Sequence, residues 1–106
     1  MAIDGEQKLA FTAVAGWVLQ NRRESKAWSQ AYVGSNVGVS QAGWAKIEKG
    51  LVPISLPQLV RFSRMLNEPT ERLIEDIEYA VEKCEAAKKP VVFERPPLKV
   101  SDAAAS

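Results

Sequence analysis

Apolar positions recur along most of this chain at helical spacing, with no β-hairpin signal between them. In the range 6–26 the apolar surface is wider than a single stripe and ends in a polar, mostly basic segment. Two breaks follow, at Pro53, since proline cannot continue a helix, and at 67–69. The pattern predicts an all-α fold with about five helices: 6–26, 29–37, 40–49, a helix capped by Ser55, and a long last helix from about Thr70 to Lys88.

The segment from Ser29 to Gly50 holds two short helices around a glycine turn. Each helix opens on a Ser-Gln pair, and a serine oxygen at a helix start can accept a hydrogen bond from a free backbone N–H. Gly38 fits the left-handed position that ends the first of these helices. Two helices joined in this way are typical of the helix-turn-helix motif, which usually enters the DNA major groove. The pairs are Ser29-Gln30 and Ser40-Gln41.

The composition changes at Lys89. The last stretch carries three of the six prolines and ends in small residues, as extended or disordered segments do. The sequence therefore predicts two parts, a helical domain over 1–88 and a flexible tail over 89–106.

Composition and charge narrow the classes of function. The formal net charge is +1, but residues 1–67 hold eight basic and four acidic residues, net +4, and residues 68–106 hold six and nine, net −3. The positive part contains the segment 29–50, which favours a polyanionic partner there. With no histidine, one cysteine and no glycine-rich phosphate loop, we expect neither an enzyme nor a bound metal or cofactor. No secretory signal or membrane-spanning run is evident, so we expect a cytoplasmic protein.

A set of residues between positions 19 and 74 falls at recognisable spacings: Arg23, Trp28-Ser29-Gln30, Val33-Gly34, Gly38-Val39-Ser40-Gln41, Trp44, Ile47-Glu48-Lys49-Gly50, Pro53, Ser55, Leu56, Leu59 and Leu66. In these residues the chain resembles the Cro and cI phage-repressor type of helix-turn-helix, also called the XRE family. The resemblance implies a compact, lambda-repressor-like bundle of four or five helices. It also implies sequence-specific binding to operator DNA, usually as a dimer.

The same resemblance assigns DNA contacts to the starts of the two short helices. Gln30 matches a glutamine that contacts phosphate, whereas Gln41 and Ala42 open the recognition helix, whose first residues contact base edges. A glutamine can bond to adenine N6 and N7, and an alanine can contact a thymine methyl. Ala45 is short enough to admit close approach. The implied DNA-binding residues are Ser29, Gln30, Ser40, Gln41, Ala42, Ala45, Lys46 and Lys49.

Arg23 and Glu48 are implied by the resemblance to form an ion pair that ties the first helix to the end of the third. The chain departs from the family's pattern in the apolar loop 51–54, which offers fewer phosphate contacts. Gly43 departs from it too, because a glycine inside the recognition helix weakens that helix. The first and last helices are also longer than is usual in the family.

The long last helix carries an apolar stripe that approximates a heptad seam. Such a stripe can pack within the chain or form a subunit interface, and we expect a homodimer through it. Trp17 has the same two alternatives. The expected dimer interface consists of Leu73, Ile77, Ala80, Val81 and Cys84.

Three hypotheses of function follow. The first is a sequence-specific transcriptional regulator, a repressor that binds a pseudo-palindromic operator as a homodimer. The second is the antitoxin of a toxin–antitoxin pair, which would bind its own promoter and also a toxin. The third is a protein-interaction module that keeps the fold without binding DNA, motivated by the apolar loop and the low net charge. The expected partners are operator DNA, a second copy, and a toxin or another regulator.

Overall fold

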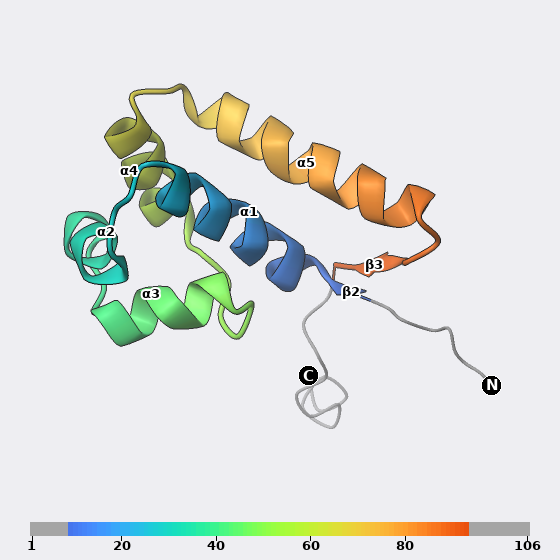
Figure 1. Cartoon of the computed structure of the whole chain (residues 1–106), viewed down its shortest axis with the longest axis horizontal. Coiled ribbons are helices and arrows are strands. Elements are labelled where there is room, and N and C mark those ends of the chain that lie inside the picture. The colour runs from blue at the N-terminus through green and yellow to red at the C-terminus, as the bar shows by residue number, and fades with distance from the viewer. Residues whose placement is uncertain (1–8, 94–106) are drawn as a thin grey trace, which may run out of the picture.

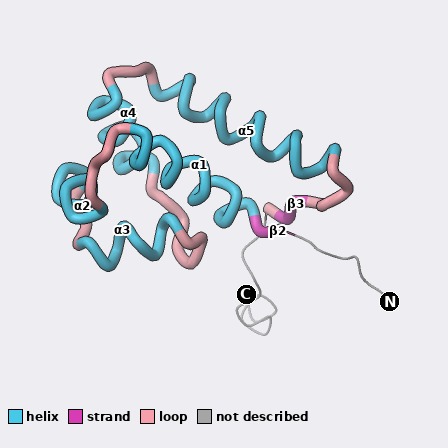
Figure 2. Tube along the Cα trace, in the orientation of Figure 1, coloured by secondary structure: helices cyan, strands magenta, loops and turns pink. Residues whose placement is uncertain are grey.

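Five helices and one pair of very short strands make up the computed structural model, which describes residues 9–93 (Figures 1 and 2). The all-α fold predicted from the sequence is confirmed, with two strands of two residues each as an addition. No helix in this range is both long enough and apolar enough to cross a membrane. The elements are β2 (Leu9–Ala10), α1 (Phe11–Ser25), α2 (Gln30–Val37), α3 (Gln41–Glu48), α4 (Leu56–Leu66), α5 (Thr70–Ala86) and β3 (Val91–Val92).

Serine side chains cap the N-termini of three helices. Ser29 accepts a hydrogen bond from the backbone N–H of Tyr32 at the start of α2, with an Oγ–N distance of 3.0 Å. Ser40 accepts one from Gly43 at the start of α3, at 2.9 Å. Ser55 and Gln58 form a reciprocal capping box at the start of α4. Each cap satisfies a backbone donor that the helix itself leaves free, so the local sequence sets where α2, α3 and α4 begin.

The main core lies where α1, α2, α3 and α4 meet and reaches the first turns of α5. Trp44 of α3 and Phe62 of α4 are fully buried, and their ring centroids are 5.2 Å apart. Helix α1 lies between α5 and α3, with α2 and α4 at one end (Figure 1). The buried members of this core are Leu19, Val33, Val37, Trp44, Ile47, Leu59, Phe62, Leu66 and Leu73.

A parallel pairing of β2 with β3 closes the other end of the bundle. Leu9 lies opposite Val91, whose side chain is buried against Val14 of α1 and Val81 of α5. Phe93 stacks on Phe11 with ring centroids 5.0 Å apart. These contacts bring the two ends of the described chain together (Figure 2).

The prediction of a flexible tail from residue 89 is wrong for residues 89–93, because the chain turns back after α5. Lys88 adopts a left-handed conformation with φ of 66°, and Lys89 donates its backbone N–H to the carbonyl of Cys84. The apolar residues that follow then have α1 and α5 to pack against. The remainder of the predicted tail, 94–106, lies outside the described residues. The first helix begins at Phe11 and not at residue 6, because Leu9 and Ala10 form the strand β2 directly before it.

The expected dimer interface on the last helix also needs correction. Leu73 has no exposed surface, and Ile77 and Val81 are buried against α1 within the same chain. Residues buried in the monomer cannot form a seam with a second copy. The wide apolar surface of α1 is the partner that this stripe required. The remaining two members, Ala80 and Cys84, are half-buried and line a groove between α1 and α5.

Candidate nucleic-acid interface

Helices α2 and α3 form a tight unit because the chain has a glycine at their closest approach. A Cβ atom on Gly34 would lie 2.8 Å from the carbonyl oxygen of Val39 and 3.0 Å from that of Ser40. Gly38 ends α2 in a left-handed conformation, with φ of 92°, and donates its N–H to the carbonyl of Gly34. The two helices therefore meet through a turn with no room for larger residues at Gly34.

Helix α3 has one buried face and one exposed face. Trp44, Ile47 and Glu48 are buried. Most of the residues expected to contact DNA occupy the other side: Gln41, Ala42 and Lys46 are exposed, Ala45 is half-buried, and Lys49 is exposed just beyond the end of the helix. Helix α3 lies along one edge of the molecule, on the opposite side of α1 from α5 (Figure 1). The exposed face of α3 is therefore accessible to an elongated binding partner.

Glu48 is the centre of a buried polar network. Glu48 is only 5% exposed. Arg23 pairs with it through two hydrogen bonds, Nε to Oε2 at 2.6 Å and Nη2 to Oε1 at 3.0 Å. Trp44 Nε1 donates to Oε2 at 2.5 Å, and Gln30 Nε2 donates to Oε1 at 2.9 Å. Both oxygens of the carboxylate are therefore satisfied, as a buried charge requires.

The network also sets the ionisation of Glu48. Burial by itself raises the pKa of this carboxyl, but the hydrogen bonds from Arg23, Gln30 and Trp44 outweigh burial, and the pKa lies below its ordinary value. In turn, the hydrogen bond with Glu48 raises the pKa of Arg23. Arg23 further donates Nη1 to the carbonyl of Trp28 at 2.9 Å. The pair is charged and connects α1 to α3 and to the segment before α2.

The carboxylate of Glu48 orients two glutamines in succession. An ionised carboxylate only accepts hydrogen bonds, so Gln30 turns its amide NH₂ toward Glu48. Its carbonyl oxygen then faces Gln41, whose Nε2 donates to it at 3.3 Å. This leaves the carbonyl oxygen of Gln41 and its second amide hydrogen for an outside partner. The sequence alone indicates no link between the two glutamines, which only their three-dimensional proximity reveals.

The other expected site residues take different positions. Ser29 and Ser40 are exposed, and both hydroxyl oxygens serve as helix caps. Lys46 and Lys49 are exposed, and neither forms an ion pair with another residue in the range 9–93. The apolar loop after α3 lies at the surface, with Leu51 68% exposed. Within the part of the chain that the structure describes, no three acidic or cysteine side chains are grouped so that they could hold a metal ion.

A model of the helix-turn-helix domain family matches residues 14–75, which is more than half of the chain. The chain belongs to the helix-turn-helix family. The resemblance to the Cro and cI type of helix-turn-helix seen in the sequence agrees with this family. The matched range contains α2, α3 and every residue of the Glu48 network.

One curated relative is similar to part of this helix-turn-helix protein. Multiprotein-bridging factor 1 of Pyricularia oryzae (strain 70-15) is 38% identical to it over 50 residues. The aligned part is 47% of this chain and 31% of the relative. The chain therefore matches only about a third of the length of that relative, so the likeness concerns one domain.

Two solved structures share the fold of this helix-turn-helix protein. The restriction-modification controller protein C.AhdI from Aeromonas hydrophila superimposes with a TM-score of 0.54 at 21% identity, covering 58% of this chain and 94% of the controller. Hydroxypropylphosphonic acid epoxidase from S. wedmorenis superimposes with a TM-score of 0.52 at 23% identity, covering 64% of this chain and 35% of the epoxidase. At these identities the likeness establishes the fold alone.

Proposed function

We propose that this protein is a sequence-specific repressor that binds a pseudo-palindromic operator as a homodimer, with α3 in the major groove. The observation that carries the proposal is the position of Gln41. It lies on the exposed first turn of α3, and its amide is held by Gln30, which is held by the buried Glu48. A side chain ordered before binding loses less conformational entropy when it contacts a base.

Gln41 is the residue that we expect to discriminate between bases. Its free carbonyl oxygen can accept from adenine N6, while its second amide hydrogen donates to N7, a pairing that selects adenine by about 1–3 kcal/mol. Ala42 offers a methyl group to a neighbouring thymine. Ala45 is small enough for α3 to approach the base edges closely.

The remaining contacts in this proposal are to phosphate and fix the register on DNA. Lys46 and Lys49 supply positive charge on the exposed side of α3, and Lys46 also reaches a guanine. Ser29, Gln30 and Ser40 lie at the starts of α2 and α3, where backbone N–H groups favour anions. The loop 51–54 adds no positive charge, so we expect a shallow dependence of affinity on salt. In a homodimer, two α3 helices would occupy half-sites about 34 Å or a multiple of that distance apart.

Genome-wide DNA pull-down sequencing tests this proposal, with the wild type beside Gln41→Ala in a host that carries the gene. Gln20→Ala is the matched control, because the Gln20 amide donates to Glu24 within α1. We expect a palindromic motif upstream of a few genes, kept in the control and lost in Gln41→Ala. A folded wild-type protein that enriches no motif would exclude a sequence-specific regulator. Transcript levels of the bound genes, which should rise when the gene is deleted, separate repression from activation.

A protein-bridging function is a second candidate, favoured by the exposed loop after α3. Leu51 and Val52 lie at the surface there, where a phosphate contact would call for polar or basic residues. The fungal relative is named as a bridging factor. For this candidate, Leu51→Glu should abolish capture of a transcription-associated protein without changing the DNA motif. An unchanged set of captured proteins would exclude it.

A further inference from the structure

A groove of about 670 Å³ lies between α5, the start of α4 and the start of α1. Apart from Ser55 and three glutamates, the residues that line it are apolar. Three of these apolar side chains reach solvent, since Leu56 is 67% exposed, Phe93 64% and Ile74 40%. An adjoining depression of about 340 Å³ extends the apolar surface to the loop 51–54. Contiguous exposed apolar surface of this kind is typical of sites that bind another protein.

A row of glutamates runs along α5 beside this groove. They recur every three or four residues, so they lie on the same side of the helix. All are exposed, and none forms an ion pair with another residue in the range 9–93. Like charges at this spacing disfavour a helix, so the stability of α5 does not account for the row. Glu78, Glu82 and Glu85 line this acidic groove, and Glu71 and Glu75 continue the row toward the start of α5.

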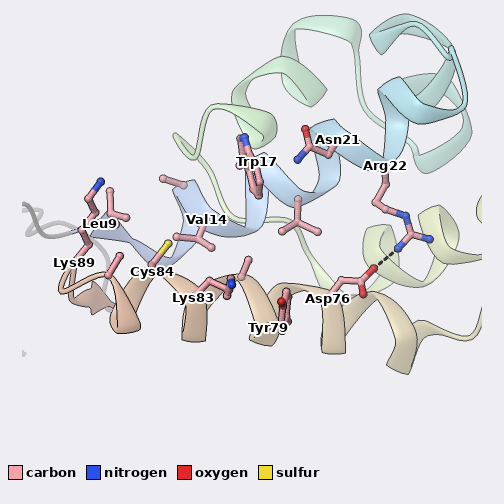
Figure 3. Close-up of a pocket in the computed structure, with 14 residues that line it drawn as sticks. Leu9, Val14, Trp17, Asn21, Arg22, Asp76, Tyr79, Lys83, Cys84 and Lys89 are labelled. Carbon is pink, nitrogen blue, oxygen red and sulfur yellow. Dashed lines mark hydrogen bonds and ion pairs between the residues drawn. The ribbon is translucent and has the colours of Figure 1, made fainter.

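The groove between α1 and α5 lies on the other side of α5 and has no such uniform charge. It shares no lining residue with the acidic groove. Lys83 and Lys89 line it together with Arg22 and Asp76, which pair with each other (Figure 3). The Nζ atom of Lys83 lies over the ring of Tyr79, 5.7 Å from its centroid. Lys83 is thus directed to the other groove and does not neutralise the row of glutamates.

The charge of the acidic groove disfavours two kinds of occupant. DNA is one, because its phosphates are repelled by carboxylates. A second copy docked through the same groove is the other, because a two-fold contact brings the same patch of both subunits together. The three lining glutamates would then face their counterparts, and like charges in an interface are unfavourable. The groove fits instead a polypeptide that is apolar on one side and basic next to it.

We propose that the acidic groove binds an amphipathic helix of another protein, with apolar side chains on the floor and lysine or arginine side chains against the glutamates. A helix laid into an apolar groove is a common mode of protein recognition. Basic residues three and four positions apart on a helix match the spacing of Glu78, Glu82 and Glu85. Ion pairs of this kind flank the apolar seam of coiled coils. Helix α5 supplies the acidic half of such an interface.

The partner helix and DNA occupy separate surfaces, and this step rests on the proposed function. The acidic groove is lined by residues of α1, α4, α5, the loop before α4 and Phe93, whereas α3 supplies the proposed base contacts. Helix α5 lies on the opposite side of α1 from α3 (Figure 1). A regulator bound to its operator can therefore hold a second protein beside the DNA.

Fluorescence anisotropy with a synthetic peptide tests the groove. The probe is a labelled amphipathic helix of leucine and lysine, and the comparison peptide has glutamate in place of every lysine. We expect the full chain to bind the leucine–lysine peptide at micromolar concentration. The leucine–glutamate peptide should bind at least about tenfold more weakly, because its charges repel the glutamates. No binding of the first peptide, or equal binding of both, would overturn the proposal.

Charge reversal at Glu82 locates the contact on the chain. Glu82→Lys should weaken binding of the leucine–lysine peptide at least about threefold and strengthen binding of the leucine–glutamate peptide. Glu24→Lys is the matched control, because it makes the same change of charge at an exposed residue near the other end of α1. At about 0.15 M salt distant charges are screened, so the control should bind both peptides as the wild type does. Equal effects of the two variants would overturn the proposal.

Leu56→Glu tests the apolar floor in the same assay. A carboxylate there would lose its hydration when the helix binds, so the leucine–lysine peptide should bind at least about fivefold more weakly. Tyr79→Glu is the control, because Tyr79 is 62% exposed and lines the other groove. Circular dichroism establishes that every variant is folded. Equal binding by Leu56→Glu and Tyr79→Glu would show that the peptide is held elsewhere.

Photo-cross-linking in a host that carries the gene identifies the natural occupant. A photo-reactive residue replaces Leu56 in the full chain, and mass spectrometry identifies the peptide linked to it. We expect a segment of another protein with apolar and basic residues at helical spacing. Cross-links to residues 94–106 of the same chain, cross-links to a second copy, or none at all would overturn the proposal.

DNA binding separates this proposal from the proposed function. Gln41→Ala should lose the operator motif and bind the leucine–lysine peptide as the wild type does. Glu82→Lys should keep the operator motif while it binds that peptide more weakly. If the wild type enriches no DNA motif, the proposed function fails, and the peptide measurements still decide whether the acidic groove binds a basic helix.

Discussion

Two regions of the molecule differ in the kind of contact that they can offer a partner. One is the unit formed by α2 and α3, and the other is the groove between α1 and α5. In the first, a buried carboxylate holds polar side chains in fixed orientations up to the surface. In the second, two aromatic side chains lie exposed among apolar neighbours, with charges at the two ends. Hydrogen bonds are directional, whereas apolar burial is not. The first surface is therefore suited to distinguish bases, and the second is suited to bury apolar surface against a partner.

This difference predicts different responses to mutation. A change at the centre of the polar network should affect both folding and DNA recognition, because the same carboxylate stabilises the core and orients Gln30. A polar change in the groove should leave the fold intact, since Trp17 and Tyr79 are largely exposed.

The largest effect is expected from Glu48→Ala. Removing the carboxylate leaves the Arg23 guanidinium, the Trp44 N–H and the Gln30 amide without their partner. Breaking one side of such a buried pair costs about 3–5 kcal/mol of the free energy of unfolding. Urea denaturation followed by circular dichroism measures it. Glu24→Ala is the control, because Glu24 is an exposed and more distant partner of Arg23, at 3.6 Å, and it should change stability by less than about 0.5 kcal/mol.

The pH dependence of stability should come in part from the same carboxyl. The pKa of Glu48 is lowered in the folded protein. Its contribution is therefore fully present above the unfolded-state pKa of about 4.3 and is lost as the pH falls through the lower folded-state pKa. Glu48→Gln cannot ionise, so the stability difference between wild type and this variant should shrink as the pH falls from about 6 to 3. A difference that stays constant over this range would contradict the ionised network.

The elements of the fold that depend on neighbouring residues could be predicted from the sequence. Ser29, Ser40 and Ser55 cap helices where expected, because a cap needs only the residues that follow it. The pairing of β2 with β3 could not be predicted, because it joins two-residue strands from opposite ends of the described chain. The stripe containing Leu73 and Ile77 was assigned to a dimer, because periodicity identifies an apolar face without identifying what covers it.

The candidate site was predictable as a set of residues but not as a network. The Ser-Gln pairs and the family resemblance pointed to the starts of α2 and α3. The role of Gln30 as a link between Glu48 and Gln41 depends on which way each amide points, and this follows from the positions of three side chains from different elements. For the same reason, the sequence alone does not decide whether Trp17 packs within the bundle or in a subunit contact.

A smaller effect is expected from Gln30→Ala, on specificity more than on folding. Without the carbonyl oxygen of Gln30, the amide of Gln41 is free to rotate, and the preference for adenine should fall by about 1 kcal/mol at one base pair of each half-site. Competition binding between the operator and a version with that base pair changed measures the preference. Equal discrimination by Gln30→Ala and the wild type would show that Gln41 needs no such support.

The smallest effect is expected from Gly43→Ala, which separates helix propensity from the network. Gly43 lies inside α3, where alanine is more favourable than glycine by about 1 kcal/mol. The new Cβ would lie 3.3 Å from both the Ser40 Oγ and the Val39 Cβ, so these side chains must move slightly and the gain is reduced to about 0.5 kcal/mol. Thermal unfolding measures the change. The new Cβ would contact Ser40 and Val39 but neither Glu48 nor Gln30. The preference for adenine should therefore stay as in the wild type. A loss of specificity with a gain in stability would instead mean that α3 must deform to fit the major groove, and that the orientation of Gln41 is not set in advance.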